Sequence, residues 1–180
     1  MAGSSPQPAA AGGYSAQAAY VGLMMGIIWR GLVSMSQVDD VVRREIAALP
    51  AGYTIRMTVM GNGPSFAVEV LEDGRLKLLP GFSGRATLNV VFKHMAHAFL
   101  VFSFQEGTAR AFANDRMYVD GNLSHAIRLV RCLNRMEAVI LPKFVAERAI
   151  KRYPAIRLGE KLSLATRTYG RLVGNLLKGE

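Results

Sequence analysis

The sequence predicts an α+β fold, in which short strands are preceded and followed by helices. Apolar residues recur with a period of two in the stretches between residues 54 and 92, as in strands that bury one face. Before and after this region they recur at helical spacing, and turns rich in Gly, Asn and Pro separate the segments. With 180 residues and 51% hydrophobic content, the chain is long enough to form one well-buried core.

The N-terminal part is expected to contain a leader followed by helices. Residues 1–13 are predicted to be disordered, and the absence of Lys or Arg before Arg30 argues against a secretory signal. Residues 14–50 are predicted to form two helices, the second capped by Ser36. The apolar run Ala18–Trp29 is shorter than the roughly 20 residues that cross a bilayer. Packing of this helix against the domain, or against a second copy of the chain in a homo-oligomer, is therefore favoured.

Residues 54–78 are predicted to form a three-stranded antiparallel meander. Gly61-Asn62-Gly63 and Asp73-Gly74 separate its alternating runs, and both sequences suit tight hairpin turns with positive φ. Ala86–Phe92 is predicted to be the next strand and Lys93–Gln105 a helix.

The order of these elements resembles that of the sterol carrier protein (non-specific lipid-transfer) domain family over residues 53–141. The most specific part of the resemblance is RMYVDGNLSHAIRL (residues 116–129), in which a strand passes through Gly121-Asn122 into a helix. Gly121 permits a sharp turn and Asn122 can cap the helix, so a purely structural corner is the simplest interpretation of these two residues. The order includes Thr108–Ala113 and Arg116–Asp120, which the sequence predicts as short strands. The resemblance implies an antiparallel five-stranded sheet covered on one face by helices.

The resemblance also implies an apolar tunnel between the sheet and the helices. We expect noncatalytic binding and transfer or presentation of an apolar lipid, which would be fatty acyl, sterol-like or isoprenoid. The candidate lining residues are Leu88, Val90, Phe99, Phe102, Phe112, Met117, Val119, Leu123, Ile127 and Val130. Large apolar residues more often form a plain core. This leaves open an accessory or scaffold protein with a filled core, which would recruit a partner enzyme or a membrane through its tail.

The positive charge of the chain is concentrated in residues 142–180. The whole sequence has a net charge of +9, and this segment, with nine basic and three acidic residues, contributes +6. We predict a basic amphipathic helical tail that contacts an anionic membrane surface or a partner protein. Nucleic acid is not favoured, because few aromatic residues accompany the charges. The predicted contact residues are Lys143, Arg148, Lys151, Arg152, Arg167, Arg171 and Lys178.

No catalytic, metal or cofactor site is predicted. His94 and His97 have a spacing compatible with a metal, but no third ligand is close in sequence. Cys132 is the single cysteine and is expected to be buried and inert. It gives no indication of an oxidising compartment, so a cytoplasmic protein, associated at most peripherally with membranes, is expected. The sequence shows no combination of acid, base and nucleophile, and no enzyme activity is expected.

Overall fold

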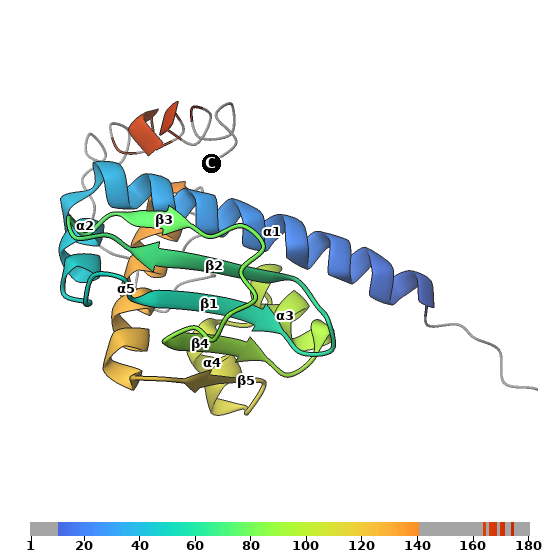
Figure 1. The fold of residues 1–180 in the computed structure, drawn as a ribbon. Coiled ribbons are helices and arrows are strands. Elements are labelled where there is room, and N and C mark those ends of the chain that lie inside the picture. Colours follow the sequence, from blue (N-terminus) through green and yellow to red (C-terminus); the bar gives the residue numbers. More distant parts are fainter. Residues whose placement is uncertain (1–10, 141–163, 165, 169, 172–173, 175–180) are drawn as a thin grey trace, which may run out of the picture.

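A five-stranded sheet with helices on one face forms the centre of the molecule (Figure 1). The computed structural model describes residues 11–140 and, near the C-terminus, residues 164, 166–168, 170, 171 and 174. The strands lie in the order β3-β2-β1-β4-β5. Their bounds are β1 Thr54–Val59, β2 Ser65–Val70, β3 Leu76–Leu78, β4 Leu88–Phe92 and β5 Met117–Asp120. The predicted α+β class and the sheet of five strands are confirmed.

The sheet contains one parallel pair, which the prediction of an antiparallel sheet did not include. β4 runs parallel to β1, with Ile55 opposite Leu88 and Val59 opposite Phe92, whereas the other neighbouring strands are antiparallel. The chain adds β2 and β3 on one side of β1. It then crosses the open face of the sheet and adds β4 on the other side (Figure 1). This long crossover is what allows two strands to run in the same direction.

Helix α1 (Ala11–Val38) packs along the sheet and supplies much of the core. Trp29 is fully buried and stacks on Phe66 of β2, with ring centroids 5.4 Å apart and an interplanar angle of 11°. By length and composition the stretch Ala16–Val38 is also apolar enough to cross a membrane, and half of its most apolar window is buried in the fold. The helix begins at Ala11, inside the predicted leader, and residues 1–10 lie outside the described part.

Helix α2 (Asp40–Ala47) is capped by Asp39, so the prediction of Ser36 as its cap is wrong. An Asp39 carboxylate oxygen accepts hydrogen bonds from the backbone N–H groups of Val41 and Val42 at 2.7 and 3.2 Å. Ser36 lies within α1, and its hydroxyl accepts a hydrogen bond from the backbone N–H of Leu76 at 3.0 Å. The serine therefore connects α1 to β3 instead of starting a helix.

Three further helices follow β4, namely α3 (Met95–Phe102), α4 (Thr108–Ala113) and α5 (Leu123–Ile140). The predicted helices at α3 and α5 and the predicted strand at β5 are confirmed. The prediction of a strand at Thr108–Ala113 is wrong, because this segment is helical, with the N–H of Ala111 bonded to the carbonyl of Gly107. Its alanines alternate with other residues and imitate a period of two, but alanine and arginine are among the best helix formers.

The predicted corner at Gly121-Asn122 is confirmed. Gly121 has φ +131°, and a Cβ atom there would lie 2.7 Å from the carbonyl oxygen of Thr87. The side-chain oxygen of Asn122 accepts a hydrogen bond from the N–H of Ser124 at 2.8 Å and so caps the first turn of α5. The corner turns the chain from β5 at the sheet edge into the helix beneath it.

Candidate functional site

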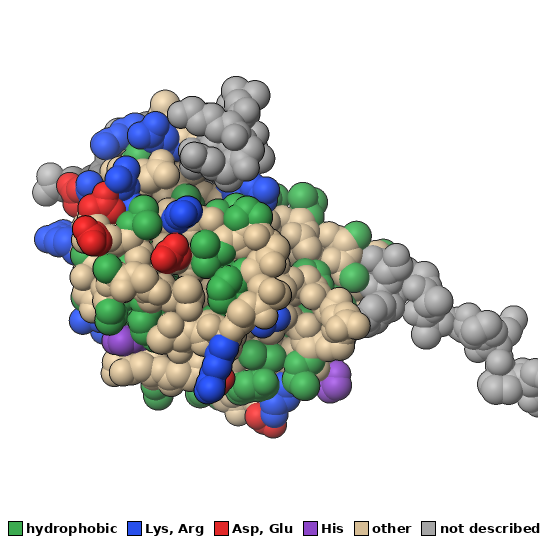
Figure 2. All heavy atoms as spheres, in the orientation of Figure 1, with side chains coloured by type: hydrophobic (Ala, Val, Ile, Leu, Met, Phe, Trp, Pro, Cys, Tyr) green, Lys and Arg blue, Asp and Glu red, His purple; other side chains and the backbone are tan. Residues whose placement is uncertain are grey.

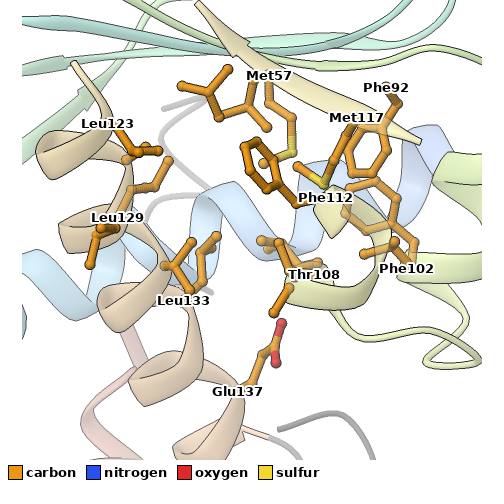
Figure 3. Close-up of a pocket in the computed structure, with 18 of the residues that line it drawn as sticks. Met57, Phe92, Phe102, Thr108, Phe112, Met117, Leu123, Leu129, Leu133 and Glu137 are labelled. Atoms are coloured by element: carbon orange, nitrogen blue, oxygen red, sulfur yellow. The ribbon is translucent and has the colours of Figure 1, made fainter. Parts of the chain in front are cut away.

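An apolar cavity of about 400 Å³ lies between the sheet and the helices α4 and α5 (Figure 3). Inward-facing side chains of β1, β4 and β5 form one wall, and α1, α3, α4 and α5 supply the others. Its volume is within the roughly 300–1,000 Å³ that is usual for ligand pockets. The lining residues are Ile28, Met57, Val90, Phe92, Val101, Phe102, Phe104, Thr108, Ala109, Phe112, Met117, Val119, Leu123, Ala126, Ile127, Leu129, Val130, Leu133 and Glu137.

The local sequence explains why these side chains converge. On the strands, every second residue points toward the helices, so Val90 and Phe92 of β4 face the cavity together with Met117 and Val119 of β5. On α5, the lining residues recur at intervals of one to four positions from Leu123 to Glu137, as expected for one broad face of a helix.

Three exposed apolar side chains mark the mouth of the cavity. Phe112 of α4 is 46% exposed, and Leu123 and Ile127 of α5 are 56% and 47% exposed, yet all three line the cavity. Exposed apolar residues that adjoin a cavity are typical of a binding surface. A ligand with an apolar chain would therefore enter between α4 and α5.

Eight of the ten predicted lining residues lie in the wall of the cavity, and two do not. Leu88 is fully buried in the core beside the Gly121 corner. Phe99 faces α1, where its ring meets that of Tyr20 edge-on at a centroid distance of 5.4 Å. Periodicity placed both residues on apolar faces but could not say which neighbour each face meets.

The sequence analysis also missed residues that line the cavity. Met57 and Phe92 were assigned to strands without a place in the wall, and Ala109 and Thr108 were assigned to a strand that is a helix. Glu137 was missed altogether, since a glutamate on an amphipathic helix is normally read as solvated. Its position 14 residues after Leu123, near the apolar stripe of α5, was the available signal.

Glu137 is the titratable side chain among the described lining residues. Burial raises its pKa from 4.5 to about 7, because the apolar surroundings disfavour the charged carboxylate. Figure 3 shows its carboxyl group directed toward Thr108, at the end of the cavity away from Leu123 and Met57. The cavity thus has an apolar lining and one polar end.

The other candidate reactive groups lie outside this cavity. Cys132 is buried as predicted, and burial, the largest cause, raises the pKa of its thiol to about 12. The rings of His94 and His97 approach edge-on at 5.0 Å, and no cluster of three metal-ligating side chains occurs within the described residues. Among the described residues that line the cavity, no Ser, Cys, His or Lys stands beside Glu137.

Only part of the predicted tail can be assessed. In the described C-terminal residues, Leu164 and Thr168 are buried, and the Thr168 hydroxyl donates to the sulfur of Met35 at 3.1 Å. Arg167 and Arg171 are exposed. Figure 2 shows Lys and Arg side chains gathered at this end of the molecule. The predicted contact residues Lys143, Arg148, Lys151, Arg152 and Lys178 lie outside the described residues.

Comparison with known proteins gives structural similarities without a sequence match. No family model and no curated protein matches the chain. A solved structure described as the UbiJ-SCP2 ubiquinone synthesis protein is 15% identical, with a TM-score of 0.45 over 64% of this chain and 96% of that chain. The sterol carrier protein domain 2 of Helicoverpa armigera is 12% identical, with a TM-score of 0.45 over 74% and 94% of the two chains.

A third similar structure is the apo form of sterol carrier protein 2 from Yarrowia lipolytica, which is 15% identical with a TM-score of 0.40 over 61% of this chain and 88% of that chain. At these identities the similarity is one of fold and leaves the activity of this chain open. The descriptions of all three structures name SCP2 or sterol carrier proteins.

Proposed function

We propose that this protein binds an apolar lipid in the cavity between the sheet and α4 and α5, and that it carries out no chemistry on that lipid. The observation that supports the proposal is the 400 Å³ cavity, whose described lining is apolar except for Thr108 and Glu137. Removing apolar surface from water contributes roughly 25 cal/mol per Å², so an apolar chain is held there without any reactive group. The scaffold alternative requires a filled core and is less favoured by a cavity of this volume.

The test is to identify what the purified protein carries. The protein is extracted with organic solvent, and the extract is analysed by mass spectrometry for fatty acyl lipids, sterols and isoprenoids. Delipidated protein is then titrated with a fluorescent fatty acid and a fluorescent sterol. Absence of lipid from the extract, together with no uptake of either probe by folded protein, would overturn the proposal.

A pair of tryptophan variants connects any binding to this cavity. Val130 lines the cavity, and Val130→Trp is expected to fill much of it and to abolish probe uptake. Ser124, on the same helix, is exposed and does not line the cavity, so Ser124→Trp is the matched control that retains uptake. Equal uptake by both variants, with both shown to be folded by circular dichroism, would place the ligand elsewhere.

The proposal extends to transfer or presentation of the lipid at an anionic membrane surface in the cytoplasm. It is supported by the charge of +6 in residues 142–180 and by the exposure of Arg167 and Arg171. Each basic residue near an anionic surface contributes about 1 kcal/mol, so the double variant Arg167→Gln/Arg171→Gln should bind vesicles containing phosphatidylserine about 30-fold more weakly. Unchanged binding would show that these two arginines do not contact the membrane.

Substitution is preferable to deletion of the tail in that experiment. Leu164 and Thr168 are buried, and Thr168 contacts Met35 of α1, so removing the segment would expose part of the core.

The proposal also includes contact between two copies of the chain through α1. Leu23 and Ile27 of α1 are exposed apolar residues that would suit this contact. Sedimentation of Leu23→Glu/Ile27→Glu beside the unaltered protein tests that contact, and an unchanged mass would rule it out.

A further inference from the structure

We propose that Glu137 binds the polar end of the ligand, so that the cavity takes an amphiphile with an apolar chain and an uncharged hydroxyl end in preference to one that ends in a carboxylate. This inference rests on the proposed lipid binding and adds the chemical class of the ligand. It follows from where Glu137 lies, what surrounds it and which charges are already paired.

The position of Glu137 gives the cavity a direction. Leu123, at the mouth, and Glu137 are 14 residues apart on α5, which corresponds to about 21 Å along a helix. Between them the side chains of α5 that line the cavity are apolar. In Figure 3 the Glu137 carboxyl group points toward Thr108, at the end of the cavity that is farther from the sheet. A chain that enters at the mouth would thus meet a polar group at the far end.

The arginines on the same helix do not neutralise Glu137 in the described structure. Arg135 pairs with Asp39 at 2.9 Å, and Arg128 pairs with Glu45 at 2.8 Å. Arg131 approaches the same Glu45 at 3.5 Å. Each of these basic groups is therefore engaged on the α2 side of α5, and no described residue forms an ion pair with Glu137.

The carboxyl group of Glu137 has no hydrogen-bond partner among the described residues, and a ligand can supply one. Burial raises its pKa to about 7, so near neutral pH both the ionised and the protonated forms are present. A ligand hydroxyl donates to the ionised form and accepts from the protonated form, and it satisfies the group in both states. A ligand carboxylate would bring a second negative charge into the same apolar space, which is unfavourable unless one group takes up a proton.

The experiment compares two ligands that differ in their polar end. Dodecanol and dodecanoate are each used to displace a fluorescent apolar probe from delipidated protein at pH 8.5. At this pH, bound dodecanoate places a second carboxylate beside that of Glu137 unless one of the two takes up a proton. The variants are Glu137→Gln, which has the same shape without the charge, and Thr108→Val, which removes the other polar group of the lining and keeps the carboxylate.

Wild-type protein is expected to bind dodecanol at least tenfold more tightly than dodecanoate, since a hydrogen bond to a charged group and the avoided repulsion both favour the alcohol. Glu137→Gln should lower this ratio, mainly by binding dodecanoate more tightly. Thr108→Val should keep the wild-type preference. An equal preference in wild type and Glu137→Gln would overturn the role of Glu137, whereas failure of both ligands to displace the probe in folded wild-type protein would count against the proposed function itself.

Discussion

The partly buried carboxyl group of Glu137 should make the stability of the protein depend on pH, and Glu137→Gln should remove that contribution. In the folded protein the pKa is raised from 4.5 to about 7 by burial. The folded state therefore binds this proton more tightly than the unfolded state does. The contribution of this group to the free energy of unfolding is therefore greatest below pH 4.5. It falls as the pH rises from 4.5 to about 7.

The size of the effect follows from the shift. Moving the pKa from 4.5 to about 7 corresponds to about 3 kcal/mol, which is the stability lost by pH 8 relative to acid conditions. Glutamine has no proton to lose. The free energy of unfolding of Glu137→Gln minus that of wild type should thus increase by about 3 kcal/mol between pH 4.5 and pH 8. A pH-independent effect of the substitution would shift this difference without changing its increase.

The assay is urea unfolding of lipid-free wild type, Glu137→Gln and Glu137→Asp at a series of pH values. Subtracting the wild-type curve from the Gln curve cancels the contributions of all other titrating groups, provided that both proteins unfold in one step. Glu137→Asp keeps a carboxyl group and should keep most of the slope. A difference between Gln and wild type that stays flat with pH would refute the interpretation of Glu137 as a desolvated carboxyl group.

Three further outcomes are expected. Gly121→Ala should destabilise the fold by about 2 kcal/mol, because a Cβ would clash with the Thr87 carbonyl at a φ of +131°; thermal unfolding measures it, and the open Gly81 is the control. Asp39→Asn should cost about 3 kcal/mol, since it removes the buried carboxylate that lies 2.9 Å from the Arg135 guanidinium, and urea unfolding of Asp39→Asn, Arg135→Gln and the double variant isolates the pair. Cys132 should resist Ellman's reagent at pH 8 until denaturant is added, because its thiol is buried with a pKa of about 12.

Each of these expectations has a result that contradicts it. A Gly121→Ala protein as stable as wild type would show that the corner can relax. Additive effects of the Asp39 and Arg135 substitutions would show that the ion pair contributes little. Rapid modification of Cys132 in native buffer would show that the interface between α2 and α5 opens readily.

The parts of the fold that the sequence predicted correctly depend on local chemistry. The turn at Gly121-Asn122 needs a residue that tolerates positive φ and a side chain that caps the next helix, and both needs are met by adjacent residues. The same holds for the meander, where Asn62 and Gly74 adopt the positive φ angles that tight turns require.

The parts that the sequence did not predict depend on contacts between distant segments. Ser36 and Asp39 are both good caps, and the choice between them follows from the hydrogen bond of Ser36 to Leu76, forty residues away. The parallel pairing of β1 and β4 likewise depends on where the crossover sends the chain, which no local pattern encodes. The prediction that Phe99 and Leu88 line the cavity was wrong for the same reason.

The misassigned segment Thr108–Ala113 bears directly on the candidate site, because α4 is one wall of the cavity. As a strand it would have extended the sheet and left the face of α5 bare. As a helix it lines the cavity opposite α5 and places Phe112 at the mouth.

Glu106 holds α4 in that position. Its buried carboxylate lies 2.8 Å from the Arg116 guanidinium and accepts a hydrogen bond from the Asn114 side chain at 2.8 Å, so it ties the start of α4 to its end and to the beginning of β5. Two glutamates therefore have opposite roles here. Glu106 is neutralised by a partner and fixes the wall, whereas Glu137 lacks a partner among the described residues and faces the space that the wall encloses. A charge that only stabilised the fold would be expected to resemble Glu106, and this contrast is the reason for assigning Glu137 to the ligand.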